Sequence, residues 1–274
     1  MLLATIGSLS DFWVSAGVAA ATEIVVFLVA FACSRVLGRN SVVDVFWGLS
    51  FVAVAATTFA VARARSTGCL GLQVTVLAAV WLWGLRLAGY LAIRQRGGGE
   101  DPRYAWIMKG AKGRNETLYA LRTIYGLQLL LAWVVSLPVQ AAMVGGPPIA
   151  WLAGVGVAVY LVGICFEAVG DAQLRRFKAD PANARSVMDR GLWAWTRHPN
   201  YFGDATVWWG VWIVAASSGI AAVSIVGPIT MTWLLTSVSG RPILERSLSR
   251  RKDGWDEYVA RTSSFLPRPP RRAR

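Results

Sequence analysis

Residues 149–170 read IAWLAGVGVAVYLVGICFEAVG, and Glu167 is their only charged residue. A helix needs about 20 consecutive, mostly apolar residues to cross the hydrocarbon core of a bilayer. The stretch therefore predicts a membrane-spanning helix. Other runs are similarly apolar, and the predicted spans lie at about 12–36, 42–62, 70–93, 119–144, 149–170, 202–217 and 219–238. The fold class that we predict is all-α, a polytopic membrane helical bundle with about seven transmembrane helices.

The composition excludes an ordinary soluble domain. The mean hydropathy is +0.47, 55% of the residues are hydrophobic and only 16% are charged, against about 25% charged residues in soluble globular proteins. The chain has three cysteines, which lack CxxC spacing, and one histidine. We therefore expect neither a disulfide framework nor a metal site.

Lysine and arginine residues gather in alternate loops. Six lie in residues 94–118, six in 171–201 and ten in 239–274, whereas the loops on the opposite side carry only Arg63 and Arg65. Because basic residues are enriched in cytoplasmic loops, we predict an N-out/C-in orientation. The predicted organisation is a seven-helix transmembrane domain (1–240) with cytosolic loops 94–118 and 171–201, followed by a basic cytosolic C-terminal tail (241–274).

The same features predict the surroundings of the protein. The first apolar run lacks a preceding basic segment and is longer than the core of a signal peptide, so we interpret it as a retained helix. The absence of targeting signals favours the inner (plasma) membrane of a bacterium, with the active site toward the cytosol. Membrane lipids are expected partners of the basic segments. Nucleic-acid binding is not expected, because the aromatic residues lie in the spans, and no obligate protein partner is evident.

A dense polar stretch opens the sixth predicted span. It reads Arg197-His198-Pro199-Asn200-Tyr201-Phe202-Gly203-Asp204 and contains the chain's one histidine. Polar groups at the mouth of an apolar span are costly unless they bind something, so the stretch is a candidate binding site. The alternative for His198 is a structural role, in which the ring hydrogen-bonds a loop carbonyl.

Two neighbouring segments carry further candidate groups. Helical spacing places Glu167, Asp171, Arg175 and Lys178 on one stripe at the end of the fifth span, either as a ligand site or as a solvated row of ion pairs. The loop 94–104 reads RQRGGGEDPRY, and its glycines either let backbone amides approach a ligand or form a flexible connector. No Rossmann fingerprint is present.

Two acids lie in or beside the early spans. Glu23 is halfway along the first span and must face the bundle interior or pair with another group. Asp44 begins the second span, where it either caps the helix or belongs to an active site. Arg86, in the third span, is a candidate partner for either acid.

These motifs together resemble the membrane-embedded steroid 5-alpha-reductase-like family, and its bacterial members in particular. The resemblance is carried by Gly191-Leu192-Trp193, by residues 197–204 and by Trp208-Trp209-Gly210. Supporting matches are Asp44-Val-Phe-Trp47-Gly48, Trp83-Gly-Leu-Arg86, residues 100–104, Asp171-Ala-Gln173-Leu174 and residues 258–267. The Arg-His-Pro element also occurs in isoprenylcysteine and phospholipid methyltransferases, which look like distant relatives.

The resemblance implies a seven-helix bundle that binds NADPH in its cytosolic half. It implies hydride transfer to an electron-poor carbon–carbon double bond of a lipophilic small-molecule substrate, a lipid-like or steroid-like enone. Asp171 and Asn200 match cofactor positions of the family, and Arg94 and Arg103 match loosely as phosphate-facing cations. The remaining cofactor-binding residues that we predict are Glu167, Lys178, Arg197, His198, Tyr201 and Asp204.

The predicted catalytic residues are Asp44 with Tyr104 or Tyr90. Steroid reductases pair a membrane carboxylate with a tyrosine three residues before an arginine, to polarise the substrate carbonyl. Here Trp83 holds that position before Arg86, and an indole cannot replace a phenol as proton donor. This difference affects 3-oxo-steroid reduction more than NADPH binding, and the phenol would come from Tyr104 or Tyr90.

Two other function classes remain. The first is an S-adenosylmethionine-dependent lipid or prenylcysteine methyltransferase. Such relatives often carry two glutamates after the last span, whereas this chain has Leu244-Glu245-Arg246. The second is a lipid-binding or transport protein without enzymatic activity, for which interrupted, inverted repeats would be expected. The sequence shows no such repeats.

Overall fold

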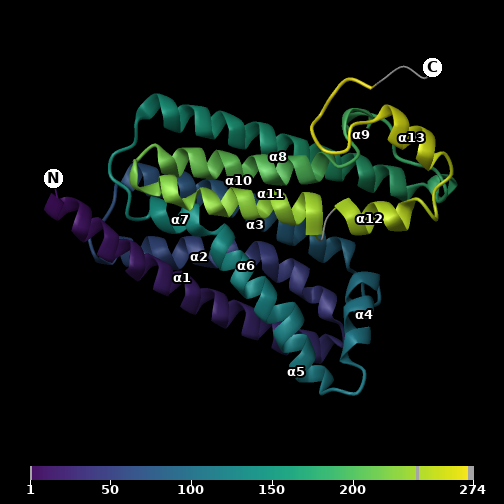
Figure 1. The fold of residues 1–274 in the computed structure, drawn as a ribbon, viewed down its shortest axis with the longest axis horizontal. Coiled ribbons are helices and arrows are strands. Elements are labelled where there is room, and N and C mark those ends of the chain that lie inside the picture. The colour runs from purple at the N-terminus through teal and green to yellow at the C-terminus, as the bar shows by residue number, and fades with distance from the viewer. Residues whose placement is uncertain (1, 239–240, 271–274) are drawn as a thin grey trace. The chain divides into compact units, whose positions relative to one another are not determined.

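The computed structural model describes residues 2–238 and 241–270. In these residues, helices are joined by turns and loops, and no strand is present (Figure 1). The all-α prediction is confirmed. The longer helices are α1 (Leu2–Leu37), α2 (Val43–Ala64), α3 (Leu70–Arg94), α8 (Ala150–Ala179) and α10 (Pro199–Ala216). Shorter ones are α4 (Pro102–Met108), α5 (Glu116–Ala120), α6 (Leu127–Val135), α7 (Leu137–Ala142), α9 (Leu192–Trp195), α11 (Val226–Trp233), α12 (Arg241–Leu248) and α13 (Trp255–Arg261). Single-turn, 3₁₀ or π segments are η1 (Asn40–Val42), η2 (Lys109–Ala111), η3 (Leu121–Gly126), η4 (Pro181–Asn183), η5 (Ile220–Ile225) and η6 (Leu234–Val238).

Five of the described helical stretches are long and apolar enough to cross a membrane. They are Leu9–Leu37, Asn40–Ala64, Leu70–Arg94, Glu116–Val135 and Ala150–Ala179. The chain is therefore an integral membrane protein of the polytopic helical class. The sixth and seventh predicted spans also fall on helices, α10 and the shorter apolar stretch Val223–Val238. Some boundaries differ from the prediction. Helix α8 continues past residue 170 to Ala179, and the fourth span, predicted to reach residue 144, ends at Val135, after which α7 is a separate short helix.

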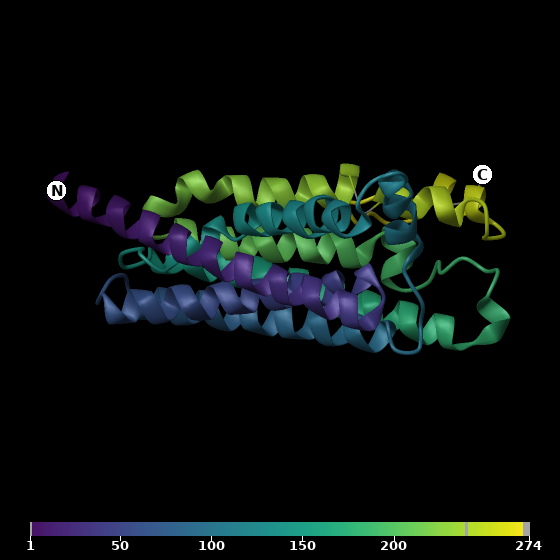
Figure 2. The same cartoon turned by 90° about the horizontal axis from the view of Figure 1, so that it is seen from below.

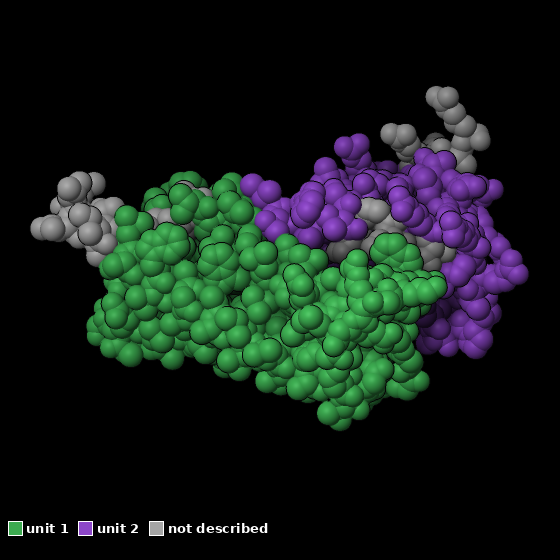
Figure 3. Space-filling model, turned by 60° about the horizontal axis from the view of Figure 1, so that its bottom comes forward, with its two compact units in different colours: residues 1–153, 211–227 green, residues 154–210, 228–274 purple. Residues whose placement is uncertain are grey.

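The chain folds into two compact units, which Figure 3 colours separately. Unit 1 comprises residues 1–153 and 211–227, and unit 2 comprises residues 154–210 and 228–274. The segment predicted as a tail, 241–274, contains α12 and α13 and belongs to unit 2. Hydrogen bonds join it to residues before α10: Tyr258 Oη donates to Trp193 O over 2.7 Å, and Thr196 Oγ1 donates to Phe265 O over 2.8 Å.

In unit 1, α2 packs against both α1 and α3 (Figure 2). Helices α2 and α3 approach closely at Gly48 and Gly84, where a Cβ atom on either residue would lie 2.7 Å from the carbonyl oxygen of the other. Beside this crossing, Phe51 and Trp83 pack edge to face, with ring centroids 5.4 Å apart. The indole of Trp83, which is 0% exposed, is therefore part of the core.

In unit 2, α8 and α10 touch along glycines. A Cβ atom on Gly203 would lie 2.6 Å from the carbonyl oxygen of Gly163, and one on Gly210 would lie 2.5 Å from the backbone nitrogen of Tyr160. Side chains at these glycines would hold the two helices apart. Because the backbones are in contact, polar residues on the facing sides of α8 and α10 are brought together.

Candidate functional site

In unit 2, the predicted cofactor-binding residues Asp171 and Asn200 are neighbours. The Asn200 side-chain amide donates a hydrogen bond from Nδ2 to Asp171 Oδ1 over 3.2 Å. Asp171 is 4% exposed, and Asn200 is half-buried and thus reachable from outside. Gly170 lies beside this pair, and a Cβ atom there would be 3.2 Å from the Pro199 ring, a tight contact. Pro199 is the first residue of α10, where its missing N–H costs nothing.

Two further acids lie on the same contact between α8 and α10. Glu167 precedes Asp171 by four residues and Asp204 follows Asn200 by four, so each lies one turn away on the same helix face. Both side chains are buried. The structure thus pairs Asp171 with Asn200 and places Glu167 and Asp204 one helical turn from this pair. Lys178 lies about two turns beyond Asp171, at the exposed end of α8.

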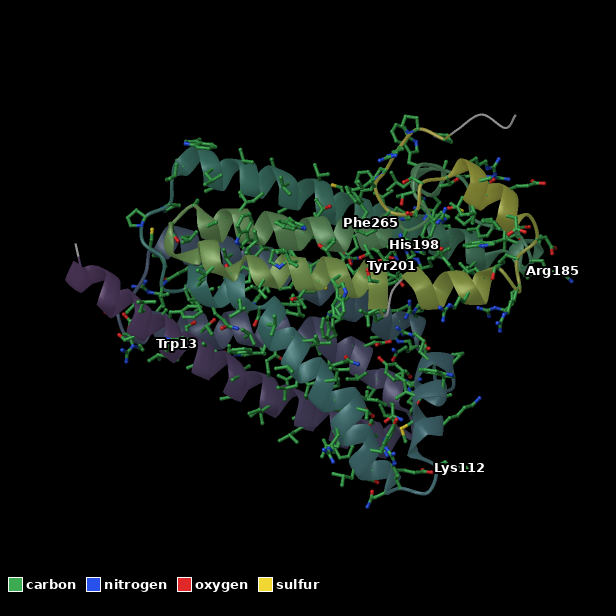
Figure 4. All side chains as sticks on the ribbon, in the orientation of Figure 1. Trp13, Lys112, Arg185, His198, Tyr201 and Phe265 are labelled. Atoms are coloured by element: carbon green, nitrogen blue, oxygen red, sulfur yellow. The ribbon has the colours of Figure 1, made fainter. Side chains whose placement is uncertain are left out.

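Arg197 and His198 are held by the C-terminal segment. Glu245 Oε1 accepts a hydrogen bond from Arg197 Nε over 3.0 Å and another from His198 Nε2 over 2.9 Å. Arg197 Nη1 also donates to Thr262 O over 2.9 Å. The His198 ring is 1% exposed and stacks on Tyr201, with ring centroids 5.3 Å apart and an interplanar angle of 4°. Figure 4 labels both rings.

These contacts differ from the structural alternative for His198 and add Glu245 to the candidate site. Nε2 of His198 contacts a carboxylate and not a loop carbonyl. Glu245 was noted in the sequence only as a single acid, and its partners lie 48 and 47 residues away. The signal in the sequence is an isolated acid within a basic segment, which could have suggested a partner for Arg197.

The ionisation of His198 and Glu245 follows from burial and from their mutual contact. Burial lowers the pKa of His198 below its ordinary value, and the hydrogen bond to Glu245 opposes this effect without cancelling it. Burial alone would raise the pKa of Glu245, but the hydrogen bonds from His198 and Arg197 outweigh it and lower that pKa. At neutral pH the imidazole is therefore neutral and the carboxylate is charged.

In unit 1, the predicted pair Asp44 and Tyr104 is formed. Tyr104 Oη donates to Asp44 Oδ1 over 2.5 Å, and Arg103 Nη2 donates to Asp44 Oδ2 over 2.7 Å. Arg103 Nε also donates to Asp101 Oδ1 over 3.0 Å. Gln128, which the sequence did not single out, donates from Nε2 to Tyr104 Oη over 3.3 Å. Gln128 lies inside an apolar run, where a lone amide is a signal for a buried polar contact.

Burial and the negative charge of Asp44 together determine the pKa values of Arg103 and Tyr104. Burial alone would lower the pKa of Arg103, but the negative charge of Asp44 outweighs it and raises the pKa. Burial, followed by the charge of Asp44, raises the pKa of the Tyr104 phenol well above its ordinary value. Arg103 therefore stays a cation between two carboxylates, Asp44 and Asp101, and Tyr104 keeps its proton. A guanidinium neutralised in this way has less attraction left for a phosphate than a lone cation.

The glycine-rich loop is attached to the start of α2. Glu100 accepts hydrogen bonds from the backbone N–H groups of Asn40 and Ser41, over 2.6 and 2.9 Å. Arg39 Nη1 donates to Gln95 O over 2.8 Å and to Gly98 O over 3.0 Å. The loop is thus anchored at both ends of its glycine run and is not an unattached connector. Helix α4 begins shortly after Glu100. Its N-cap residue is Asp101, whose side chain accepts a hydrogen bond from the backbone N–H of Arg103.

The other predicted residues lie at the end of α3. The Arg94 guanidinium lies over the Tyr90 ring, 6.0 Å from its centroid, and Asp44 is paired with Tyr104 instead. Among the described residues, no group of three or more histidine, cysteine, aspartate or glutamate side chains could hold a metal ion.

Comparison with known proteins gives one finding. A family model described as a protein of unknown function (DUF1295) matches residues 30–262. The match includes both polar clusters, from Asp44 to Glu245. No curated protein and no solved structure matches the chain.

Proposed function

Because the chain belongs to the DUF1295 family, we propose that it is a membrane-embedded reductase that uses NADPH to reduce the carbon–carbon double bond of a lipid-like or steroid-like enone. The proposal rests on the resemblance to steroid 5-alpha-reductases and on one observation in unit 2. That observation is the pairing of half-buried Asn200 with buried Asp171 at the start of α10.

The donor and acceptor groups of unit 2 fit a dinucleotide. Carboxylates accept hydrogen bonds from ribose hydroxyls and amino groups, and an asparagine amide both donates and accepts. Glu167, Asp171, Asn200 and Asp204 supply these groups. The exposed cations Arg175, Arg176 and Lys178 on the last turns of α8 suit phosphates. When bound, NADPH would supply a hydride, and these residues would bind and orient it.

Taken by itself, the cluster in unit 1 suits the stabilisation of negative charge on an oxygen atom. Arg103 uses Nε and Nη2 for Asp101 and Asp44, which leaves the Nη1 donors for a substrate carbonyl. The Tyr104 hydroxyl donates its hydrogen bond to Asp44, so in this structure the phenol positions the Asp44 carboxylate. A well-placed donor of this kind contributes a few kcal/mol to the stabilisation of an oxyanion.

The test is NADPH binding by purified protein in detergent. We expect Asn200→Ala to abolish saturable NADPH binding, measured by isothermal titration calorimetry. Asn183→Ala is the matched control, because Asn183 also belongs to unit 2 and its side chain donates to Phe177 O, away from Asp171. An unchanged NADPH affinity in Asn200→Ala would overturn the assignment of this cluster.

A second candidate is an S-adenosylmethionine-dependent lipid or prenylcysteine methyltransferase. The contact that favours it is Glu245 with Arg197 and His198, since the methyltransferase relatives carry glutamates after the last span. Thermal shifts with NADPH and with S-adenosylmethionine separate the two, because a ligand that binds only the folded state raises the melting temperature. We expect a rise with NADPH, and a rise with S-adenosylmethionine alone would favour the methyltransferase.

A further inference from the structure

The one histidine of the chain has a buried nitrogen without a hydrogen-bond partner. His198 Nε2 contacts Glu245, whereas Nδ1 has no partner in the described structure and is shielded from solvent. An unsatisfied buried polar atom costs about 1–3 kcal/mol. Such atoms are rare in native proteins, and each one calls for an explanation.

The contacts of the ring fix which nitrogen carries the proton. Glu245 is ionised, so its oxygens only accept hydrogen bonds. Nε2 of His198 must therefore be the protonated nitrogen, because it faces Glu245 Oε1 at 2.9 Å. Since the imidazole is neutral, Nδ1 then carries a lone pair and is an unused acceptor.

The ring is also held in place. It is stacked on Tyr201 and anchored to Glu245. The backbone N–H of His198 donates to Thr196 Oγ1 over 3.3 Å, and Thr196 Oγ1 in turn donates to Phe265 O. Turning the ring to give Nδ1 a partner would break the contact with Glu245. The unused acceptor is therefore a fixed feature of the start of α10, only two residues from Asn200.

We propose that Nδ1 of His198 accepts a hydrogen bond from an N–H group of the bound cofactor. This inference rests on the proposed nucleotide binding by unit 2 and names the atom and the ligand group involved. NADPH carries two such groups, the carboxamide of the nicotinamide and the 6-amino group of the adenine. Because Nδ1 is shielded from solvent in the ligand-free structure, a ligand reaches it only if neighbouring side chains move.

¹⁵N NMR of the full-length protein in detergent measures the chemical shift and the protonation of His198 Nδ1 directly. With one histidine in the sequence and a purification tag that lacks histidine, ¹⁵N-histidine labelling gives a single imidazole. We expect a protonated Nε2 and an unprotonated Nδ1 without ligand. Saturating NADPH should shift the Nδ1 resonance upfield, as expected for an accepted hydrogen bond, while Nε2 keeps its proton.

A substitution tests the contribution to affinity. His198→Gln retains an amide that can donate to Glu245 and removes the acceptor at the δ position. We expect its melting temperature without ligand to stay near that of the wild type, and its Kd for NADPH to rise about tenfold, the effect of one hydrogen bond. An unchanged Kd would overturn the inference.

Two cofactor analogues identify the donor. The hypoxanthine analogue of NADPH lacks the 6-amino group, and the 3-acetylpyridine analogue lacks the amide N–H. The analogue that binds without shifting Nδ1 identifies the missing donor, and a shift with both analogues would overturn the inference.

Failure of the inference and failure of the proposed function give different results. If NADPH binds and Nδ1 does not move, the inference fails and the reductase proposal stands. If only S-adenosylmethionine binds and Nδ1 shifts, the inference holds, through the adenine amino group, and the reductase proposal fails. Binding of neither compound overturns both.

Discussion

Glu245 fixes the side chains of the two residues that precede α10, Arg197 and His198. Its carboxylate accepts hydrogen bonds from Arg197 and His198, and Arg197 extends the contact to the carbonyl of Thr262. Partly buried ion pairs of this kind contribute less through Coulomb attraction than through the cost of leaving a partner unpaired. Substituting Glu245 would therefore disturb two motif residues at once.

The lowered pKa values predict how stability depends on pH. The folded-state pKa of His198 lies below its ordinary value of 6.5 and that of Glu245 below 4.5. Each contribution is present above the ordinary value and is lost as the pH falls through the folded value. We expect the melting temperature in detergent to fall as the pH is lowered from about 7.5 to about 5.5 through His198, and further below about 4.5 through Glu245.

His198→Gln serves as the control for this pH dependence, because glutamine does not titrate. Its melting temperature should change less between the two higher pH values than that of the wild type. An equally steep loss in the variant would show that another group is responsible.

Among the secondary-structure elements, the contact of α8 with α10 is the one that positions the unit 2 cluster. Gly163 and Gly203 allow the two backbones to touch. The polar pair of Asp171 and Asn200 lies farther along the same contact, so its geometry depends on how closely the two helices pack.

We expect Gly203→Ala to lower both the stability and the NADPH affinity. The new Cβ atom would lie 2.6 Å from Gly163 O and 2.8 Å from the Cβ of Glu167, and overpacking of this kind costs about 1–3 kcal/mol. Gly154→Ala is the matched control on α8, because nothing lies within 4 Å of the added Cβ. Melting temperatures and titration calorimetry check the prediction, which is wrong if the two variants behave alike.

Helix α1 carries an unusual group at mid-span. Glu23 is 0% exposed, neither of its carboxyl oxygens makes a hydrogen bond of good geometry in the described structure, and the Ser50 hydroxyl is the polar side chain beside them. Arg86, the candidate partner for either acid, donates a hydrogen bond to neither Glu23 oxygen, and Asp44 pairs with Arg103 and Tyr104. A carboxylate without a partner inside a bilayer is costly, so Glu23 is best accommodated as a neutral acid.

Glu23→Gln should then leave the melting temperature unchanged or raise it, because the amide matches the neutral acid in shape. Glu23→Lys introduces a charge at the helix centre, which costs about 2.5–3.5 kcal/mol, and should lower it markedly. Thermal unfolding of both variants in detergent is the measurement. Equal losses in the two would mean that Glu23 is needed as an ionised group.

For the whole molecule, the C-terminal segment is part of a folded unit. Arg197 N donates to Ser263 O over 2.9 Å, and Arg268 N donates to Trp195 O over 3.0 Å. These bonds, together with that from Tyr258 to Trp193, join α13 and the residues after it to the segment around α9.

Deleting residues 241–274 should therefore loosen unit 2 while unit 1 keeps its fold. We expect faster hydrogen exchange in residues 192–198 and unchanged protection at the crossing of α2 and α3. Deletion of residues 269–274 alone is the control, because it removes basic residues and none of these hydrogen bonds. Unchanged exchange in the longer deletion would contradict the prediction.

Much of the fold follows from local sequence patterns, and much of the candidate site does not. The apolar runs predicted all five long spans, because the bilayer requires about 20 apolar residues in each. Asp44 and Tyr104 were predicted to act together and are hydrogen-bonded. Glu245 and Gln128 were missed, because their partners are distant in sequence and no local pattern specifies such pairs. The N-out/C-in orientation and the bacterial inner membrane stay predictions.

The shared carboxylate also has a consequence for synthesis. His198 leaves the ribosome 47 residues before Glu245, a delay of a few seconds at about 5–20 residues per second. During that interval Arg197 and His198 lack their anionic partner while the first spans can already enter the bilayer. The start of α10 can therefore reach its final form only when translation is almost complete, and a ribosome that stalls before residue 245 would leave an inserted protein in which Arg197 and His198 lack their carboxylate.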